Sequence, residues 1–173
     1  MKLSIAAISA DKTVRKKTMK KLWTKIIIMA LGCLLLGTSS GLVTVSEIGS
    51  WYAGINKPTW NPPSWLFGPV WTLLYILMGT AAALVWHTKG AGTPKALQVF
   101  VTQFVLNLAW SPLFFYFHLI GLALVEMLVM WVLIIITIKQ FYAIHKVAAY
   151  LLIPYLAWVS FATFLTATIY HLN

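Results

Sequence analysis

Long apolar stretches alternate with short polar breaks along the 173-residue chain. Each stretch approaches the roughly 20 residues that a helix needs to cross the hydrocarbon core of a bilayer. A β-barrel would show shorter, alternating segments instead. The breaks contain Pro, Gly and Lys, which are typical of turns. The pattern therefore predicts an all-α integral membrane protein, a bundle of five transmembrane helices at about 26–46, 65–87, 96–118, 120–138 and 147–170.

The composition supports this prediction and argues against several other classes of protein. Apolar residues make up 61% of the chain and charged residues 9%, whereas a soluble domain averages about 25% charged residues. The chain has three acidic residues, far apart in sequence, which argues against a hydrolase built on paired carboxylates. One Cys forms no disulfide framework. The four His lack ligand spacing, so we expect no metal site.

The basic residues predict how the chain is oriented. Twelve of the thirteen Lys and Arg lie before the first span or in the second and fourth loops, and only Lys57 lies in the first loop. The positive-inside rule then places the N-terminus in the cytoplasm and the C-terminus outside it. We read residues 1–22 as a basic, disordered cytoplasmic tail and residues 23–173 as the membrane domain. A cleavable signal peptide over 20–40 is the alternative, and its removal would leave four spans.

The +10 net charge is thus mainly a topology signal with affinity for anionic membrane lipid. The basic tail lacks interleaved aromatic residues, so no nucleic-acid partner is expected.

Polar and aromatic side chains recur at helical spacing inside three of the spans. Residues three or four apart share one face of a helix. The stripes are Trp71 and Tyr75; Gln103, Asn107 and Ser111 with Trp110 beside them; and Tyr155, Trp158, Ala162 and Thr166. Such stripes either hydrogen-bond the helices together or line a cavity. Because large aromatic side chains suit close helix contacts poorly, we favour an aromatic pocket for a flat hydrophobic ligand.

Two further features carry candidate chemistry. Glu126 is the only acid inside the predicted membrane core; it is either a proton or cation site or a carboxyl kept neutral or hydrogen-bonded to a neighbouring helix. Residues 51–63 contain three aromatic residues and three Pro, which restrict an ordered loop. We predict a lid over the mouth of the bundle at about 47–64, and the alternative is an anchor lying on the membrane.

Motifs in the lid and on all five spans resemble the tryptophan-rich sensory protein family, the bacterial branch of the translocator protein or peripheral-type benzodiazepine receptor. The resemblance covers about residues 23–173. It rests on Trp51-Tyr52, Lys57-Pro58-Thr59-Trp60-Asn61-Pro62-Pro63, Trp71-Thr72-Leu73-Leu74-Tyr75, Gln103, Leu106-Asn107, Trp110-Ser111, Ala123-Leu124-Val125, Pro154-Tyr155, Trp158 and Phe161-Ala162.

The resemblance implies a five-helix membrane bundle, often a homodimer, with the first loop closing a pocket that binds porphyrin. It implies no cofactor, with porphyrin as ligand or substrate, and the bacterial cytoplasmic membrane as location. Some members are reported to degrade protoporphyrin in light, and the Trp implicated matches Trp71. Together with the stripes, it marks as ligand-binding Trp51, Tyr52, Trp71, Tyr75, Gln103, Asn107, Trp110, Trp158 and Ala162.

Departures from the family pattern narrow the range of ligands that we expect. Leu165-Thr166 stands where the family has Leu-Asn, and Glu126 stands where Asp is common. No Lys or Arg follows Tyr150, so the cholesterol motif of animal members is absent. The sequence favours a receptor or sensor that binds tetrapyrroles. The alternatives are an enzyme that degrades porphyrin with light and oxygen, using Trp71 as its redox residue, and a transporter of apolar compounds, for which the chain lacks inverted repeats.

Overall fold

The computed structural model describes residues 2–173, apart from the side chains of residues 2–14 and of Val43. Over this range the chain is helical, and its described part contains no β-strand. A 3₁₀ turn (η1) and a π-helical turn (η2) flank two of the α-helices. The elements are α1 (Lys2–Ile48), α2 (Trp51–Gly54), η1 (Ser64–Leu66), α3 (Phe67–Thr88), α4 (Thr93–Ser111), η2 (Pro112–Tyr116), α5 (Ile120–Ile144), α6 (Lys146–Leu151) and α7 (Ile153–Leu172).

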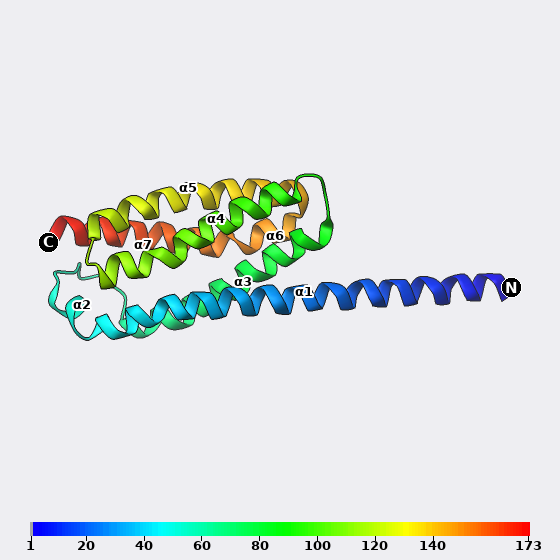
Figure 1. Cartoon of the computed structure of the whole chain (residues 1–173), viewed down its shortest axis with the longest axis horizontal. Coiled ribbons are helices and arrows are strands. Elements are labelled where there is room, and N and C mark those ends of the chain that lie inside the picture. The colour runs from blue at the N-terminus through cyan, green and yellow to red at the C-terminus, as the bar shows by residue number, and fades with distance from the viewer. Residues whose placement is uncertain (1) are drawn as a thin grey trace.

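Five helical segments are long and apolar enough to cross a membrane, which confirms the five predicted spans. They are Arg15–Ile48, Ser64–Thr88, Thr93–Tyr116, Ile120–Ile144 and Lys146–Leu172. Figure 1 shows α1 lying along α3, with α4, α5 and α7 beside each other in the rest of the bundle. The loop that contains α2 lies at the same end of the bundle as the C-terminus.

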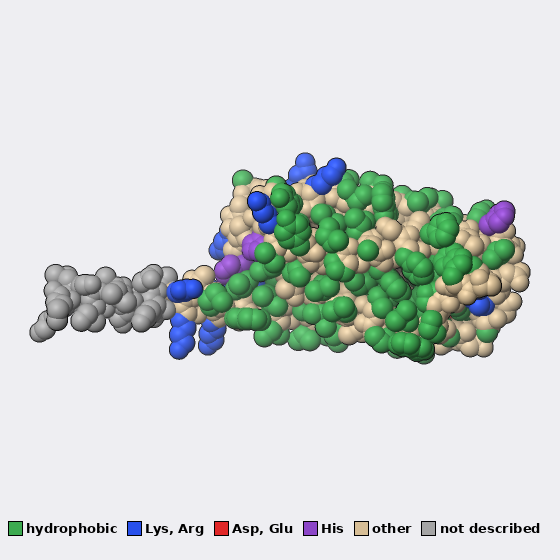
Figure 2. All heavy atoms as spheres, turned by 180° about the vertical axis from the view of Figure 1, so that it is seen from behind, with side chains coloured by type: hydrophobic (Ala, Val, Ile, Leu, Met, Phe, Trp, Pro, Cys, Tyr) green, Lys and Arg blue, Asp and Glu red, His purple; other side chains and the backbone are tan. Residues whose placement is uncertain are grey.

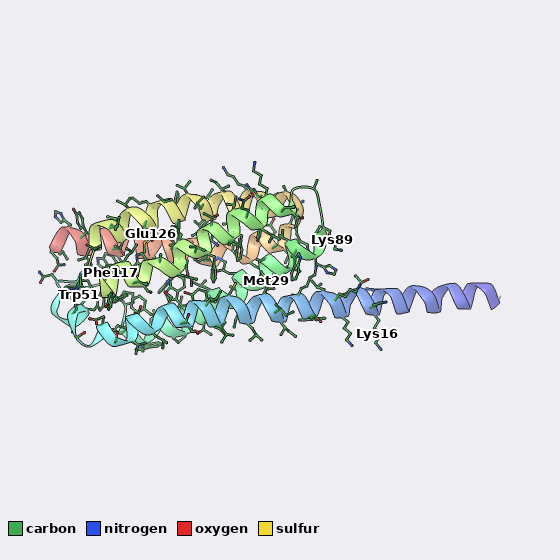
Figure 3. All side chains as sticks on the ribbon, in the orientation of Figure 1. Lys16, Met29, Trp51, Lys89, Phe117 and Glu126 are labelled. Atoms are coloured by element: carbon green, nitrogen blue, oxygen red, sulfur yellow. The ribbon has the colours of Figure 1, made fainter. Side chains whose placement is uncertain are left out.

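Helix α1 begins at Lys2, and the disordered tail expected for residues 1–22 stays a prediction. The helix runs past the end of the bundle (Figure 1), and the described side chains from Arg15 to Lys21 are exposed. Lys16 projects from this part of α1 in Figure 3.

Two short interruptions divide the end of the chain. The predicted break at 139–146 narrows to His145, whose backbone is extended (φ −153°, ψ 100°) and whose Nδ1 accepts a hydrogen bond from Ala148 N at 3.3 Å. The fifth span is interrupted at Leu152, just before Pro154 in the first turn of α7. Proline has no N–H to donate to the preceding turn, so one hydrogen bond of the helix is missing there.

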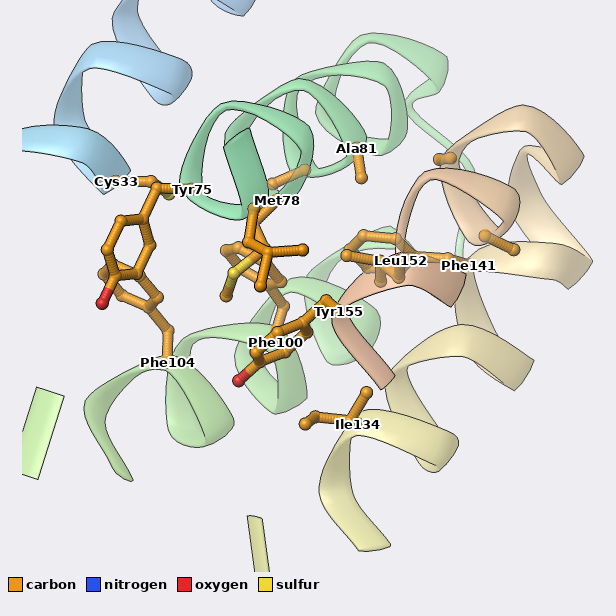
Figure 4. Close-up of a cluster of buried hydrophobic side chains, with 14 of the residues drawn as sticks. Cys33, Tyr75, Met78, Ala81, Phe100, Phe104, Ile134, Phe141, Leu152 and Tyr155 are labelled. Carbon is orange, nitrogen blue, oxygen red and sulfur yellow. The ribbon is translucent and has the colours of Figure 1, made fainter. Parts of the chain in front are cut away.

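The core lies among α3 to α7, and α1 packs against it mainly through α3. Buried side chains from α3, α4, α5, α6 and α7 meet in one cluster (Figure 4), to which α1 adds Cys33. At Gly79 the two helices approach so closely that a Cβ would lie 2.5 Å from Ala30 Cα. The outer surface is largely hydrophobic, and Lys and Arg gather near the end of the bundle where α1 emerges (Figure 2).

Candidate functional site

A cavity of about 450 Å³ lies between α1, α3 and α4, near the end of the bundle that carries the loop. This volume falls within the range of small-molecule sites. Helix α1 lines it with small and hydroxyl residues, among them Gly37, Thr38 and Gly41. Leu42 and Val45 also line it and are 70% and 72% exposed, so the cavity opens at the surface of the bundle on the α1 side.

Aromatic side chains form the opposite wall of this cavity. Trp71 and Tyr75 stack with ring centroids 5.4 Å apart and an interplanar angle of 27°. The Tyr75 ring lies over Gly37, where a Cβ would come within 2.2 Å of the ring carbons. The glycine therefore leaves the space that the ring occupies beside α1. The aromatic residues of the wall are Trp65, Phe67, Trp71, Tyr75, Trp110 and Phe115.

A second, smaller cavity of about 30 Å³ adjoins the first. Phe67, Trp71, Asn107 and Trp110 line both cavities, so these side chains form the partition between them. On its far side the small cavity reaches α5 and α7. The residues lining it there are Met127, Met130, Trp158, Val159 and Ala162.

Buried hydrogen bonds join the polar residues of three helices next to the partition. Tyr75 Oη donates to Asn107 Oδ1 at 3.2 Å, and Asn107 Nδ2 donates to Tyr155 Oη at 3.3 Å. Tyr155 Oη in turn donates to Gln103 Oε1 at 2.8 Å. These bonds satisfy groups that would be costly to bury unpaired. They also fix the orientation of the Asn107 amide in the cavity wall.

The loop between α1 and α3 is tied to the rest of the bundle. Asn56 N donates to Asn173 Oδ1 at 2.9 Å, and Asn173 Nδ2 donates back to Asn56 O at 3.0 Å. Lys57 Nζ donates to the carbonyl oxygens of Tyr52 and Ile55 at 2.5 and 2.8 Å, which closes the turn of α2. The ordered loop thus lies against the C-terminal end of α7.

Aromatic contacts complete the attachment of the loop. Trp51 stacks on His118 with ring centroids 4.2 Å apart, and His118 Nε2 lies 3.8 Å from Glu47 Oε2. Trp60 stacks on Phe164 at 5.3 Å.

Tyr52, inside the loop, is buried against Phe115, one of the cavity-lining residues. Burial raises the pKa of Tyr52, and its hydroxyl donates to Asn61 Oδ1 at 2.8 Å.

The bundle with its partition of aromatic and amide side chains invites comparison with known membrane families. The model of the TspO/MBR family matches residues 29–172, which includes all five spans except the start of α1. The chain belongs to the TspO/MBR family. This finding confirms the family resemblance read from the sequence motifs.

Curated TspO/MBR relatives are similar over most of their length. Tryptophan-rich protein TspO of Chlorobaculum tepidum is 42% identical over 143 residues, covering 82% of this chain and 90% of that protein. The human translocator protein is 43% identical over 126 residues, covering 71% and 75% respectively. A tryptophan-rich sensory protein of Cereibacter sphaeroides is 35% identical over 151 residues, covering 87% and 92%.

Most residues predicted to bind ligand in this TspO/MBR chain line one of the two cavities, and three do not. Trp71, Asn107 and Trp110 line both cavities, Tyr75 lines the larger one, and Trp158 and Ala162 line the smaller one. Gln103 is 1% exposed and engaged by Tyr155 in the core, away from either wall. Trp51 and Tyr52 lie in the loop, packed on Phe114. Lining a cavity is not ligand contact, so ligand binding by all of these residues stays a prediction.

The contribution of α1 is what the sequence analysis missed. Gly37 and Gly41 fit a helix-contact motif, yet both line the larger cavity together with Thr38 and Thr44. The signal lay in small and hydroxyl residues at spacings of three and four, which place them on one face of α1.

Among the described residues, Glu126 does not form the hydrogen bond to a neighbouring helix that was one of its predicted roles, whereas its predicted roles as a neutral carboxyl or as a proton or cation site stay predictions. Its side chain is buried on α5 (Figure 3), and neither carboxyl oxygen has a hydrogen-bond partner there. It lies outside the walls of both cavities, although Met127 and Met130 beside it line the smaller one. In the described part of the chain, no three His, Cys, Asp or Glu side chains gather as metal ligands.

Proposed function

We propose that this membrane protein is a receptor or sensor that binds porphyrin, or a similar flat hydrophobic molecule, in the larger cavity. The stacked Trp71 and Tyr75 rings along a cavity of about 450 Å³ carry the proposal. Flat rings offer a tetrapyrrole an offset-stacking surface. In the described part of the chain, no Lys, Arg, His, Asp or Glu lines either cavity, which favours an apolar ligand body.

Porphyrin titration of the purified protein in detergent tests this proposal. Changing Trp71 or Trp110 to Ala removes a ring from the wall of the larger cavity and should weaken binding about tenfold or more, as loss of a central aromatic contact does. Porphyrin absorbance is the readout, because it does not depend on the number of Trp residues. Trp23 is 58% exposed on α1 and lines neither cavity, so Trp23→Ala is the matched control. Unchanged affinity in both cavity variants would refute the proposal.

A second candidate function is light-dependent degradation of the bound porphyrin. The position of Trp71 favours it: this indole lines both cavities and has the Tyr75 and Tyr155 rings at 5.4 and 6.3 Å. In this candidate, photo-excited porphyrin and O₂ are the reactants and Trp71 is the redox-active residue. Trp71→Phe should still bind porphyrin but bleach it more slowly under light. Equal bleaching rates in the parent protein and in Trp71→Phe would show that Trp71 has no part in the degradation.

We further propose that the N-terminus faces the cytoplasm of a bacterial cell and that the protein spans the cytoplasmic membrane. Figure 2 supports this orientation, because Lys and Arg gather at the end of the bundle where α1 emerges. Labelling of single cysteines placed at Lys89 and at Asn56 with an impermeant reagent should reach only Asn56 in intact cells. Labelling at the Lys89 position alone would show the opposite orientation and overturn this proposal.

A further inference from the structure

Trp110 carries a polar group that the protein itself leaves unused. Its Nε1–H is buried and has no hydrogen-bond acceptor among the described residues. The indole ring is held in place by Phe114, stacked at 5.1 Å, and by Phe115, edge-on at 5.9 Å. A buried donor without a partner costs free energy. Native structures keep such groups where something else satisfies them.

The neighbouring polar groups are already paired with one another. The Asn107 amide is engaged by Tyr75 and Tyr155 through both its oxygen and its nitrogen. Thr38 Oγ1 donates to the Leu34 carbonyl oxygen within α1 at 2.7 Å, and Thr44 Oγ1 donates to Ser111 Oγ at 3.1 Å. Trp110 thus supplies the buried, unpaired donor of the partition.

The position of Trp110 says what could pair with it. It lies in the partition between the large cavity and the small one, whose volume of about 30 Å³ is enough for one water-sized group. A buried water needs two to four polar partners. Among the described residues, four side chains with N–H or O groups line the small cavity: the indoles of Trp71, Trp110 and Trp158, which only donate, and the Asn107 amide, whose oxygen already accepts from Tyr75. A water there would find donors but little to accept its own protons, whereas a carbonyl oxygen only accepts. An oxygen that is covalently attached to a ligand in the large cavity suits this site better than water.

Because the cavity walls formed by the described residues carry no charge, they favour an uncharged ligand oxygen as the partner of Trp110. In the described part of the chain, every residue lining the two cavities is uncharged at neutral pH. A carboxylate buried there would lose its hydration without gaining a counter-ion, and that loss is far larger than the cost for a neutral carbonyl.

From these observations we infer that Trp110 Nε1 donates a hydrogen bond to an uncharged acceptor of the ligand, a carbonyl or ester oxygen that enters the small cavity. The flat body of the ligand occupies the large cavity. This inference rests on the proposed function and adds to it the chemistry of the recognised group. It assigns the polar contact with the ligand to Trp110, whereas the Asn107 amide is already engaged by Tyr75 and Tyr155.

The test compares two porphyrins that differ in acceptor groups: protoporphyrin IX dimethyl ester, which has ester carbonyls, and etioporphyrin, which has only alkyl substituents. Trp110→Phe keeps an aromatic ring but removes the N–H. It should weaken binding of the ester about five- to tenfold, the factor for one hydrogen bond, and change etioporphyrin affinity less than about twofold. Trp131→Phe is the matched control, because Trp131 Nε1 donates to Ser160 Oγ and lines neither cavity.

Each outcome of this comparison decides the inference. Equal losses for both porphyrins, or no loss for either, would overturn the inference and leave the proposed function standing. Failure of the parent protein to bind either porphyrin would overturn both. Should Trp110→Phe not fold, the parent protein labelled with ¹⁵N at its indole nitrogens provides the test by NMR. The ester, but not etioporphyrin, should then shift an indole N–H signal downfield, and identical responses to the two would overturn the inference.

Discussion

Gly37 is the position where the structure makes the sharpest prediction. A Cβ at this residue would lie 2.2 Å from Tyr75 Cε2 and Cζ, whereas carbon atoms in contact are about 3.5–4.0 Å apart. In Gly37→Ala, either the ring or α1 must therefore move by more than about 1 Å. The Tyr75 ring is 7% exposed and packs on the Trp71 and Phe104 rings, with centroids 5.4 and 6.2 Å away, so it can move only toward the larger cavity that it lines. Its hydroxyl lies 3.2 Å from Asn107 Oδ1, so a shift of this size breaks that hydrogen bond.

The expected cost combines two terms. Overpacking at the contact between the ring and α1 costs about 1–3 kcal/mol, and the loss of one neutral hydrogen bond costs about 1 kcal/mol. A total of about 2–4 kcal/mol lowers the melting temperature of a chain of this length by about 4–16 °C. The assay is thermal unfolding in detergent, followed by far-UV circular dichroism.

Gly41 provides the matched control, because it also lines the cavity but a Cβ there meets no atom within 4 Å. Gly41→Ala should leave the melting temperature unchanged or raise it slightly, since Ala is the better helix former. In a Tyr75→Ala background, Gly37→Ala should cost almost nothing, as the clashing ring is gone. Equal melting temperatures for Gly37→Ala and Gly41→Ala would refute the reasoning.

Three further predictions concern helix contacts, the amide network and the loop. Gly79→Ala should lower the melting temperature more than Gly37→Ala does, because its Cβ would meet the backbone of Ala30 at 2.5 Å and backbone cannot rotate away. Tyr155→Phe leaves buried amide groups unpaired and should cost about 1–3 kcal/mol in the same thermal assay. Asn173→Ala removes both side-chain bonds to Asn56, so limited proteolysis should cut the loop at residues 49–63 several-fold faster, with the melting temperature little changed.

The number of spans could be predicted from the sequence because the bilayer sets a length that apolar residues must fill. Each predicted stretch corresponds to one of the five spanning segments. The interruption at His145 was harder to place, since α5 continues through Lys139 to Ile144. The pattern of polar residues predicted a break somewhere within 139–146. The backbone shows that a single extended residue, His145, separates α5 from α6.

The candidate site was predictable in part, for a geometric reason. Spacing of three or four residues shows which side chains share a helix face, as for Gln103 and Asn107, but does not show how deep each lies. Asn107 reaches the cavity wall, whereas Gln103, one turn away, is held in the core by Tyr155. Trp71 and Trp110 were found because large aromatic residues beside polar ones are unusual in close helix contacts.

The position of α1 explains why hydropathy could not locate the cavity. In lipid, apolar side chains gain little by facing another helix instead of acyl chains, so helices associate through close backbone approach and hydrogen bonds. Helix α1 meets α3 at Gly79 and is bonded to α4 by Ser40 Oγ, which donates to the Leu108 carbonyl oxygen at 2.6 Å. A second bond, from Thr44 Oγ1 to Ser111 Oγ, lies beside the cavity. Glycine and hydroxyl residues therefore set the position of α1. The larger cavity lies between these contacts, so its place depends on which residues are small, and hydropathy does not report that.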